Sequence, residues 1–91
     1  MLPFVWDETK AVSNLRKHGV SFEQASAAFD DPGITFLQDE TIAYGEVRMI
    51  AIGLMGMTLL TIVFTERGEA IRIISARRSN KMEERIYAET Y

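Results

Sequence analysis

Arginine side chains are concentrated in one segment of the chain, and arginine is well suited to binding phosphate. Residues 65–78 read Thr-Glu-Arg-Gly-Glu-Ala-Ile-Arg-Ile-Ile-Ser-Ala-Arg-Arg and contain Arg67, Arg72, Arg77 and Arg78. A guanidinium group stays charged in proteins and can donate two parallel hydrogen bonds to a phosphate group. We therefore expect a phosphate-recognition surface here, joined by Arg48 from a preceding strand. The simpler alternative is that these arginines are solvated and paired with nearby glutamates (Glu66, Glu69, Glu83 and Glu84), because surface ion pairs are common.

The spacing of these arginines limits how many can meet one ligand. Side chains of a β-strand point alternately to the two faces of a sheet. Alternation along residues 70–77 therefore places Arg72 and Arg78 on one face and Arg77 on the other. Arg72 and Arg77 can face one ligand only if a β-bulge or a strand end intervenes, so we expect at least one of them to be structural.

Several side chains could move a proton beside such a surface. Glu46 lies two residues before Arg48 and shares its face of the strand. His18 could transfer a proton, and Lys17 beside it could hold a phosphate. Tyr87 could donate a proton or stack on a base. The structural alternatives are that Lys17 and His18 complement a helix dipole and that Tyr87 packs in the core with its hydroxyl group hydrogen-bonded.

The composition narrows the class of site. The 91 residues include no cysteine and one histidine, which excludes disulfides, thiol catalysis and zinc sites built from cysteines or several histidines. The net charge of −3 argues against a uniformly basic nucleic-acid surface. Residues 1–47 carry a net charge of −5 and residues 48–91 one of +2, so an anion should bind to the second half. We expect a cytoplasmic protein with no signal peptide that needs no metal or other cofactor.

Two helices are predicted in the first third of the chain. A short strand at residues 4–6 precedes Asp7, which can cap a helix over residues 8–18, and Gly19 can end it. Ala11, Leu15 and His18 give this helix its apolar stripe, with Lys10, Asn14 and Lys17 on another face. Ser21 starts a capping box for a second helix that stops near residues 30–33.

The remaining chain alternates strands and turns before a last helix. Residues 34–37, 47–52, 59–64 and 70–77 are predicted strands, with turns at residues 53–56 and 66–69. The glycines in the uncharged segment 49–65 favour two strands over a membrane span. Ser79 or Asn80 can cap the last helix, whose apolar side carries Met82, Ile86 and Tyr87. The prediction is a single α+β domain over residues 1–91, in the order β-α-α-β-β-β-(β)-α, with a small antiparallel sheet covered by helices on one face.

The sequence resembles one family along essentially its whole length. The resemblance is carried by Phe4-Val5-Trp6-Asp7, Asn14-Leu15-x-Lys17-His18-Gly19-Val20-Ser21-Phe22, Phe29-x-Asp31-Pro32, Gly45-Glu46-x-Arg48, Thr65-x-Arg67-Gly68 and Arg72-Ile73-Ile74-Ser75-Ala76-Arg77. These segments are similar to those of BrnT-type toxins of bacterial type II toxin-antitoxin systems. The stretches 17–22 and 72–77 are the most specific.

The resemblance implies a RelE-like fold and a ribonuclease that inhibits growth. It also implies a BrnA-type antitoxin that neutralises the toxin, with DNA bound only through the antitoxin complex. Cleavage without metal requires the 2′-OH of the RNA to attack the adjacent phosphate, with a base, a charge clamp and an acid. We expect phosphate binding by Arg67, Arg72 and Arg77, further RNA contacts by Arg48, Lys17 and Arg78, proton transfer by Glu46 or His18, and stacking or acid catalysis by Tyr87.

One departure from the family and two rival functions remain. Many relatives have an arginine directly after the glycine of the central hairpin, where this chain has Met57, so activity could be weakened or the contact supplied by Arg48 or Arg67. The first rival is an inactive module that only docks an antitoxin or another partner segment. The second is direct DNA recognition, which the acidic second helix disfavours because it has no lysine or arginine.

Overall fold

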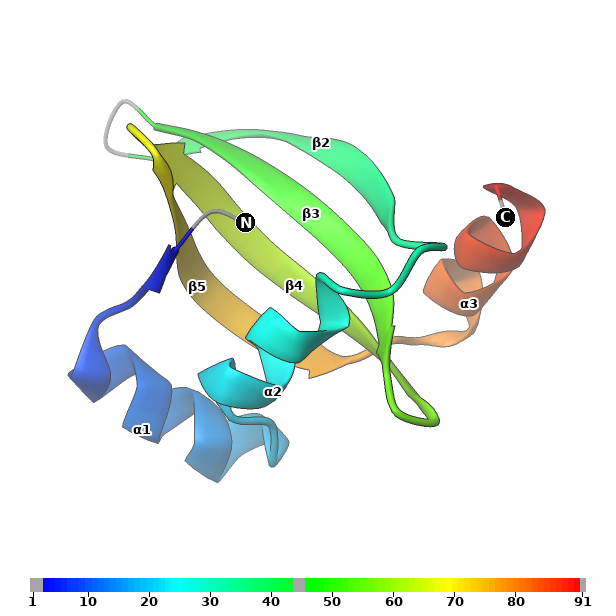
Figure 1. Ribbon diagram of the computed structural model, residues 1–91, viewed down its shortest axis with the longest axis horizontal. Coiled ribbons are helices and arrows are strands. Elements are labelled where there is room, and N and C mark those ends of the chain that lie inside the picture. Colours follow the sequence, from blue (N-terminus) through cyan, green and yellow to red (C-terminus); the bar gives the residue numbers. More distant parts are fainter. Residues whose placement is uncertain (1–2, 44–45, 91) are drawn as a thin grey trace.

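The fold is an α+β arrangement around one sheet, which confirms the predicted class and the general order of elements (Figure 1). The computed structural model describes residues 3–43 and 46–90, with residues 39–43 described by their backbone alone. The strands of this part of the chain are β1 (Phe4–Val5), β2 (Thr35–Ala43), β3 (Glu46–Met55), β4 (Thr58–Arg67) and β5 (Ala70–Arg78). Its helices are α1 (Glu8–His18), α2 (Phe22–Ala28) and α3 (Lys81–Thr90).

The strands lie in the order β1-β5-β4-β3-β2. The strands from β2 to β5 pair antiparallel with their neighbours, as predicted. β1 instead pairs in parallel with β5, so that Phe4 lies opposite Ile71 and Val5 opposite Arg72. The sheet is therefore mixed. The first strand of the chain pairs with the edge of β5 that does not pair with β4.

The helices begin and end at the local signals that the sequence provides. Asp7 accepts a hydrogen bond from a backbone N–H group in the first turn of α1, and Gly19 ends that helix with a φ of 70°. Ser21 starts α2 with a reciprocal capping box. Asn80 and Glu83 exchange the same pair of hydrogen bonds at α3, so Asn80 is the cap of that helix. None of the helices in the described residues is long and apolar enough to cross a membrane.

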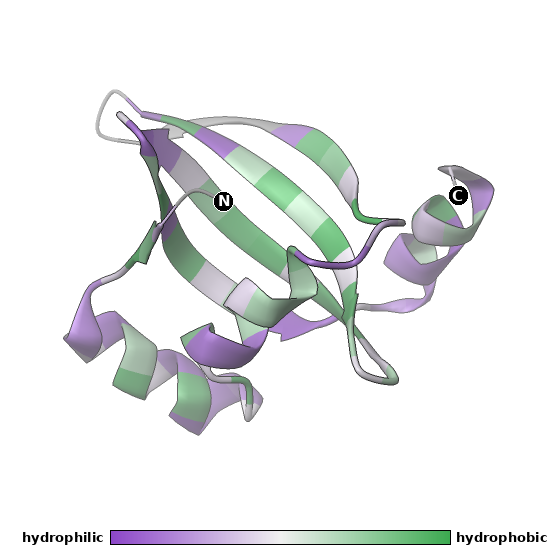
Figure 2. Cartoon of the chain, viewed as in Figure 1, coloured by the Kyte–Doolittle hydropathy of each residue, from purple (hydrophilic) through white to green (hydrophobic). Residues whose placement is uncertain are grey.

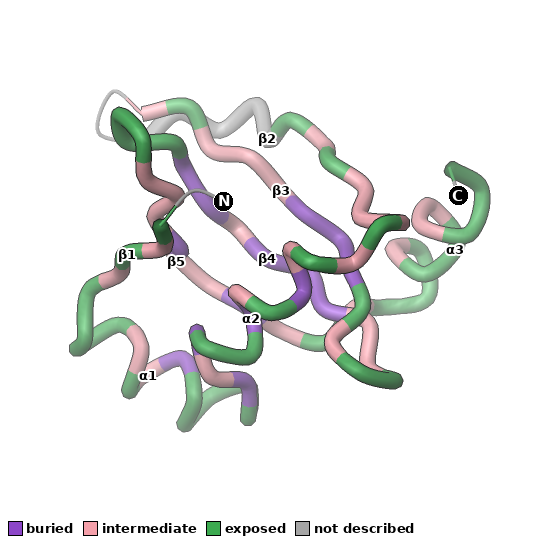
Figure 3. Tube along the Cα trace, in the orientation of Figure 1, coloured by how far each residue is buried: buried purple, intermediate pink, exposed green. Residues whose placement is uncertain are grey.

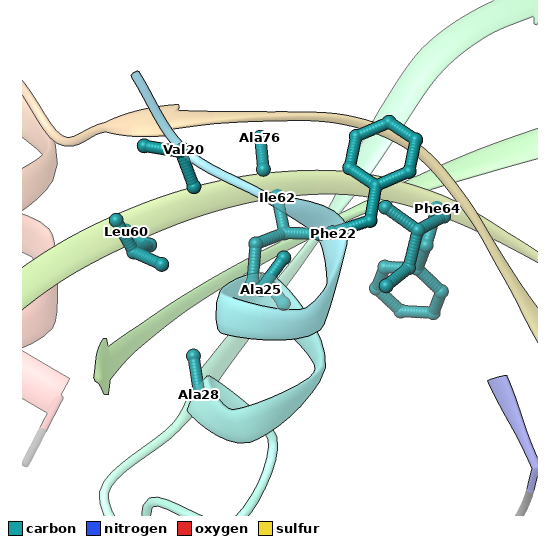
Figure 4. Packing of buried hydrophobic residues seen from close by; sticks show 10 residues of the cluster. Val20, Phe22, Ala25, Ala28, Leu60, Ile62, Phe64 and Ala76 are labelled. Atoms are coloured by element: carbon teal, nitrogen blue, oxygen red, sulfur yellow. The ribbon is translucent and has the colours of Figure 1, made fainter. Parts of the chain in front are cut away.

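The main core lies between the sheet and α2 (Figure 4), and α1 lies on the same side of the sheet along β5 (Figure 1). Its fully buried members include Phe22 from α2, Leu60 and Ile62 from β4, and Ala76 from β5. Burial is concentrated in the middle of β3 and β4, where the hydropathy is also highest (Figures 2 and 3). Removing this apolar surface from water is the main favourable contribution to folding.

The third helix covers the opposite face of the sheet at one end, which differs from the expectation that all helices share one face. The hydroxyl groups of Thr35 and Thr90 lie 2.9 Å apart, which links β2 to α3. Ile52 of β3 lies opposite Thr35 and is fully buried, yet it is not part of the main core. Its burial is explained by α3, which packs on the strand face that α1 and α2 leave uncovered. Met82 on this helix is 69% exposed, so its predicted place on the apolar side was wrong.

The buried side of α1 was also predicted incorrectly. Leu15 is 50% exposed and His18 is exposed, whereas Asn14 is only 6% exposed. The Asn14 amide donates hydrogen bonds to the carbonyl oxygens of Val20 and Ala76 and accepts one from the N–H of Ala76. A polar side chain can be buried when its hydrogen bonds are satisfied in this way, and apolar periodicity does not detect it.

The central hairpin turns three residues later than its predicted start. β3 continues through Gly53 to Met55, and the turn is made by Gly56, with a φ of 62°, and Met57. A Cβ atom at position 53 would lie 2.8 Å from the carbonyl oxygen of Ala28. Gly53 therefore serves the close approach of α2 to the strand, and Gly56 serves the turn.

Candidate nucleic-acid interface

One extra residue in β5 decides where the arginines of that strand point. Phe64 of β4 lies opposite Ile73, but the preceding Val63 lies opposite Ser75. Ile74 is therefore a bulge residue without a partner on β4. Its insertion shifts the alternation of side chains between Arg72 and the end of the strand.

The bulge brings Arg72 and Arg77 to the same face of the sheet. Arg72 lies opposite Thr65 and Arg77 opposite Thr61, and these two threonines are four residues apart on β4. Arg78 lies opposite Leu60 and points to the face that carries α1 and α2. The predicted pairing of Arg72 with Arg78 was therefore wrong, because strict alternation does not hold across a bulge.

Arg48 and Arg72 lie on either side of Thr65. Extending the Met49–Phe64 register by one residue sets Arg48 of β3 beside Thr65, while Arg72 of β5 lies on its other side. Two strand spacings separate the backbones of the two arginines, roughly 10 Å. Their side chains are long enough to reach one phosphate group placed over Thr65. Neither arginine forms an ion pair with a residue whose side chain the structure describes.

Glu46 and Arg67 form an ion pair at the hairpin end of the same face. The Arg67 guanidinium donates a hydrogen bond to a carboxylate oxygen of Glu46, and their side chains are 50% and 33% exposed. Arg67 follows Thr65 by two residues, roughly 7 Å along β4. The ion pair therefore lies next to the space between Arg48 and Arg72. We call Arg48, Arg67, Arg72 and Arg77 the arginine face.

The guanidinium group of Arg77 is already engaged by α3. It donates hydrogen bonds of 2.7 Å to each carboxylate oxygen of Glu83. The hydrogen bonds to Glu83 raise the pKa of Arg77, against an opposing effect of burial. Burial alone would raise the pKa of Glu83, but its hydrogen bonds, first that from Arg77, lower it below the ordinary value. This bidentate pair anchors α3 to the sheet, which agrees with the expectation that one of the two arginines is structural.

Lys17 and His18 line a separate polar groove between α1 and β5. The groove has a volume of about 220 Å³, and its other lining residues include Lys10, Ser13 and Ser75. Lys10 and Lys17 are two turns apart on one side of α1. Ser75 lies opposite Val63 and is therefore on the same face of the sheet as Arg72 and Arg77. The groove and the arginine face therefore meet along β5, and the sequence pattern gave no sign of this contact because it joins residues far apart in the chain.

Tyr87, Met57 and Arg78 lie away from the space between Arg48 and Arg72. The Tyr87 hydroxyl donates a 2.7 Å hydrogen bond to a carboxylate oxygen of Asp31, which ties α3 to the segment after α2. Met57 is 98% exposed in the central turn and shares a shallow pocket with Arg78. Tyr87 and Met57 therefore lie toward the end of the sheet that α3 covers, the end opposite Glu46 and Arg67.

Asp31 is a residue whose role the sequence alone did not reveal. It accepts hydrogen bonds from Tyr87 and from the backbone N–H groups of Leu54 and Gly33. Burial would raise its pKa, but these hydrogen bonds together hold the pKa below the ordinary value. An Asp-Pro pair predicts a turn, whereas the contacts of Asp31 with β3 and α3 depend on the fold. Within the described part of the chain, no three His, Cys, Asp or Glu side chains gather as metal ligands would.

A model of a known protein family matches most of the chain. A family model described as the ribonuclease toxin, BrnT, of a type II toxin-antitoxin system matches residues 6–83. The matched segment contains the strands β2 to β5, and with them every arginine of the arginine face, but not Tyr87. None of the curated proteins compared with the chain matches it. Because the family model covers most of the 91 residues, the chain belongs to the BrnT family of ribonuclease toxins of type II toxin-antitoxin systems.

Proposed function

We propose that this toxin cuts RNA on its arginine face, by attack of the 2′-OH group on the adjacent phosphate and without a metal ion. The observation that carries this proposal is the position of Arg48 and Arg72 on either side of Thr65. In the transition state the phosphate gains negative charge, and guanidinium groups held on a rigid sheet stabilise that charge. Arginine thereby supplies the positive charge that a metal ion provides in other nucleases.

The ion pair of Glu46 and Arg67 fits the role of base and orienting partner. The Glu46 carboxylate can accept the proton of the 2′-OH group, and Arg67 fixes the carboxylate through its hydrogen bond. As the phosphate binds, Arg67 can also contact one of its oxygens. The charge of Arg77 is offset by its ion pair with Glu83, so its role on this face is to anchor α3.

The groove on α1 offers a continuation of the RNA path beyond β5. Lys10 and Lys17 can hold a phosphate of a neighbouring nucleotide, and His18 can donate a proton to the leaving oxygen. Because Ser75 borders both surfaces, a single RNA strand can cross from the arginines to this groove. The Tyr87 hydroxyl is bound to Asp31, so we assign Tyr87 the role of holding α3 rather than acid catalysis.

The decisive test compares Arg72→Ala with Arg85→Ala, an exposed arginine on α3 that serves as the charge-matched control. Removal of one electrostatic stabiliser of a transition state typically slows the reaction by about a hundredfold or more. We expect that loss in RNA cleavage for Arg72→Ala, an unchanged rate for the control, and equal rates with and without a metal chelator. Cleavage by Arg72→Ala at the wild-type rate would contradict the proposed clamp.

Two further outcomes separate this proposal from its rivals. A wild-type protein that binds its antitoxin but leaves all RNA intact would be the inactive docking module. If the toxin alone shifted a specific DNA sequence in a gel, the result would support direct DNA recognition instead. We expect neither, and for DNA the reason is that α2 carries Glu23 but no lysine or arginine. We further propose that a BrnA-type antitoxin neutralises the toxin, that any DNA is bound through that complex, and that the toxin acts on RNA in the cytoplasm.

A further inference from the structure

An apolar pocket lies on the helix-bearing face of the sheet, beyond the part that α1 and α2 cover. Its volume is about 350 Å³, and it is lined by Phe29, Phe36, Met49, Phe64, Glu66 and Ile71. Along β3 and β4 the lining residues Met49 and Phe64 lie two positions from the fully buried Ala51 and Ile62. The two helices therefore stop short, and the apolar surface of the sheet continues outside them.

The pocket is rich in aromatic rings that remain accessible. The ring of Phe36 lies 6.3 Å from that of Phe29 and 6.0 Å from that of Phe64, measured between centroids, yet Phe36 is 50% exposed. Val47, which lies on the same side of β3 as Met49, is 48% exposed. Apolar pockets with aromatic walls are typical of sites that receive the anchoring side chain of a partner.

An acidic group lines this pocket. Glu66 lies on its wall and also lines a neighbouring hollow of about 430 Å³, which extends to Glu46, whose carboxylate is paired with Arg67 on the arginine face. No lysine or arginine is among the described residues that line either hollow. The arginine face lies on the other side of the sheet, so the apolar pocket with Glu66 and the arginines are on opposite faces.

We propose that this pocket is the docking site for a segment of the antitoxin polypeptide, which inserts a large apolar side chain beside Phe36 and places a lysine or arginine next to Glu66. Charge complementarity selects this occupant, because a cationic segment is attracted by Glu66 here and repelled by the arginines on the opposite face. RNA is repelled by Glu66, which leaves the arginine face to RNA.

The proposal rests on the membership in a toxin-antitoxin family and not on the ribonuclease site. It has a consequence for regulation, because the antitoxin then holds the toxin by a face other than the one that binds RNA. A complex formed through the pocket alone would leave the arginine face accessible. Full inhibition would require other parts of the antitoxin to reach around the sheet edge.

The test measures the affinity of the purified toxin for the antitoxin encoded in the same operon, by titration calorimetry. We expect Phe36→Ala to weaken binding by about tenfold or more, as loss of an aromatic anchor does. We expect Glu66→Lys to weaken it as well and to remove part of its salt dependence. Matched controls are Leu15→Ala, which also removes a 50% exposed apolar side chain, and Glu69→Lys in the β4–β5 turn. Both controls should bind within about twofold of the wild type.

Each other outcome has a defined meaning. Wild-type affinity in both pocket variants would overturn the proposal. A free toxin that sediments as a dimer, and becomes a monomer with Phe36→Ala while antitoxin binding persists, would show that a second copy fills the pocket instead. Glu66→Lys keeps the test valid if Phe36→Ala unfolds, since Glu66 is an exposed side chain. RNA cleavage by each free variant is measured in parallel, so a failure of the ribonuclease proposal is seen separately from a failure of the docking site.

Discussion

Replacement of Asn14 by alanine should destabilise the fold far more than its polar character suggests. Its side chain makes three hydrogen bonds of 2.8 to 3.1 Å, two with Ala76 and one with Val20. The two bonds with Ala76 occupy the outer edge of β5 at a point that β1 does not reach. The Asn14 amide thus takes the place of a neighbouring strand.

The magnitude follows from the groups left without partners. Asn14→Ala removes the partners of two carbonyl oxygens and one N–H group in a site where Asn14 is 6% exposed. At roughly 1 kcal/mol for each lost hydrogen bond, we expect a loss of about 3 kcal/mol in the free energy of unfolding, and more if water does not enter. For a domain of this size that is a fall in melting temperature of roughly 12 to 24 °C.

The assay is urea unfolding followed by the fluorescence of Trp6, with Val12→Ala as the control. Val12 lies two residues away on α1 and is 54% exposed, so its replacement should change stability by less than about 0.5 kcal/mol. A loss for Asn14→Ala of under about 1 kcal/mol, similar to the control, would refute the reasoning. It would show that the amide does not act as a strand substitute on β5.

Two further changes test the packing and the electrostatics of the fold. Gly53→Ala places a Cβ atom 2.8 Å from the carbonyl oxygen of Ala28. We expect this close contact to destabilise the fold by about 1 to 3 kcal/mol, measured by thermal unfolding. An unchanged melting temperature would show that α2 can move away from β3 without cost. The second concerns pH, because the folded-state pKa values of Asp31 and Glu83 are below their ordinary values of 3.8 and 4.5. Their stabilisation is therefore present above those ordinary values and is lost as pH falls through the lower folded-state values. Tyr87→Phe removes one of the hydrogen bonds that lower the pKa of Asp31, so its acid-dependent loss of stability should be smaller than that of the wild type; equal losses would contradict this role of the tyrosine.

The local features of the fold are determined by the sequence itself. Asp7, Gly19 and Ser21 mark helix ends because capping joins residues only a few positions apart. The β-branched segments predict strands, which the structure confirms. The concentration of arginines in one segment predicts a phosphate-binding surface, which stays a prediction. The order of residues along the chain was sufficient for the helix ends and the strands because each depends on short-range chemistry.

The arrangement of the site was decided by tertiary structure. Ile74 becomes a bulge residue only because β4 and β5 pair in one register, and this places Arg72 and Arg77 on a common face that alternation had separated. Asn14 is buried only because Ala76, 62 positions away, offers it an N–H and a carbonyl group. The ion pair of Arg77 with Glu83 likewise forms only because α3 packs against the sheet at this point. Such contacts depend on strand register and on burial, and these are properties of the packed chain that no local pattern of residue types encodes.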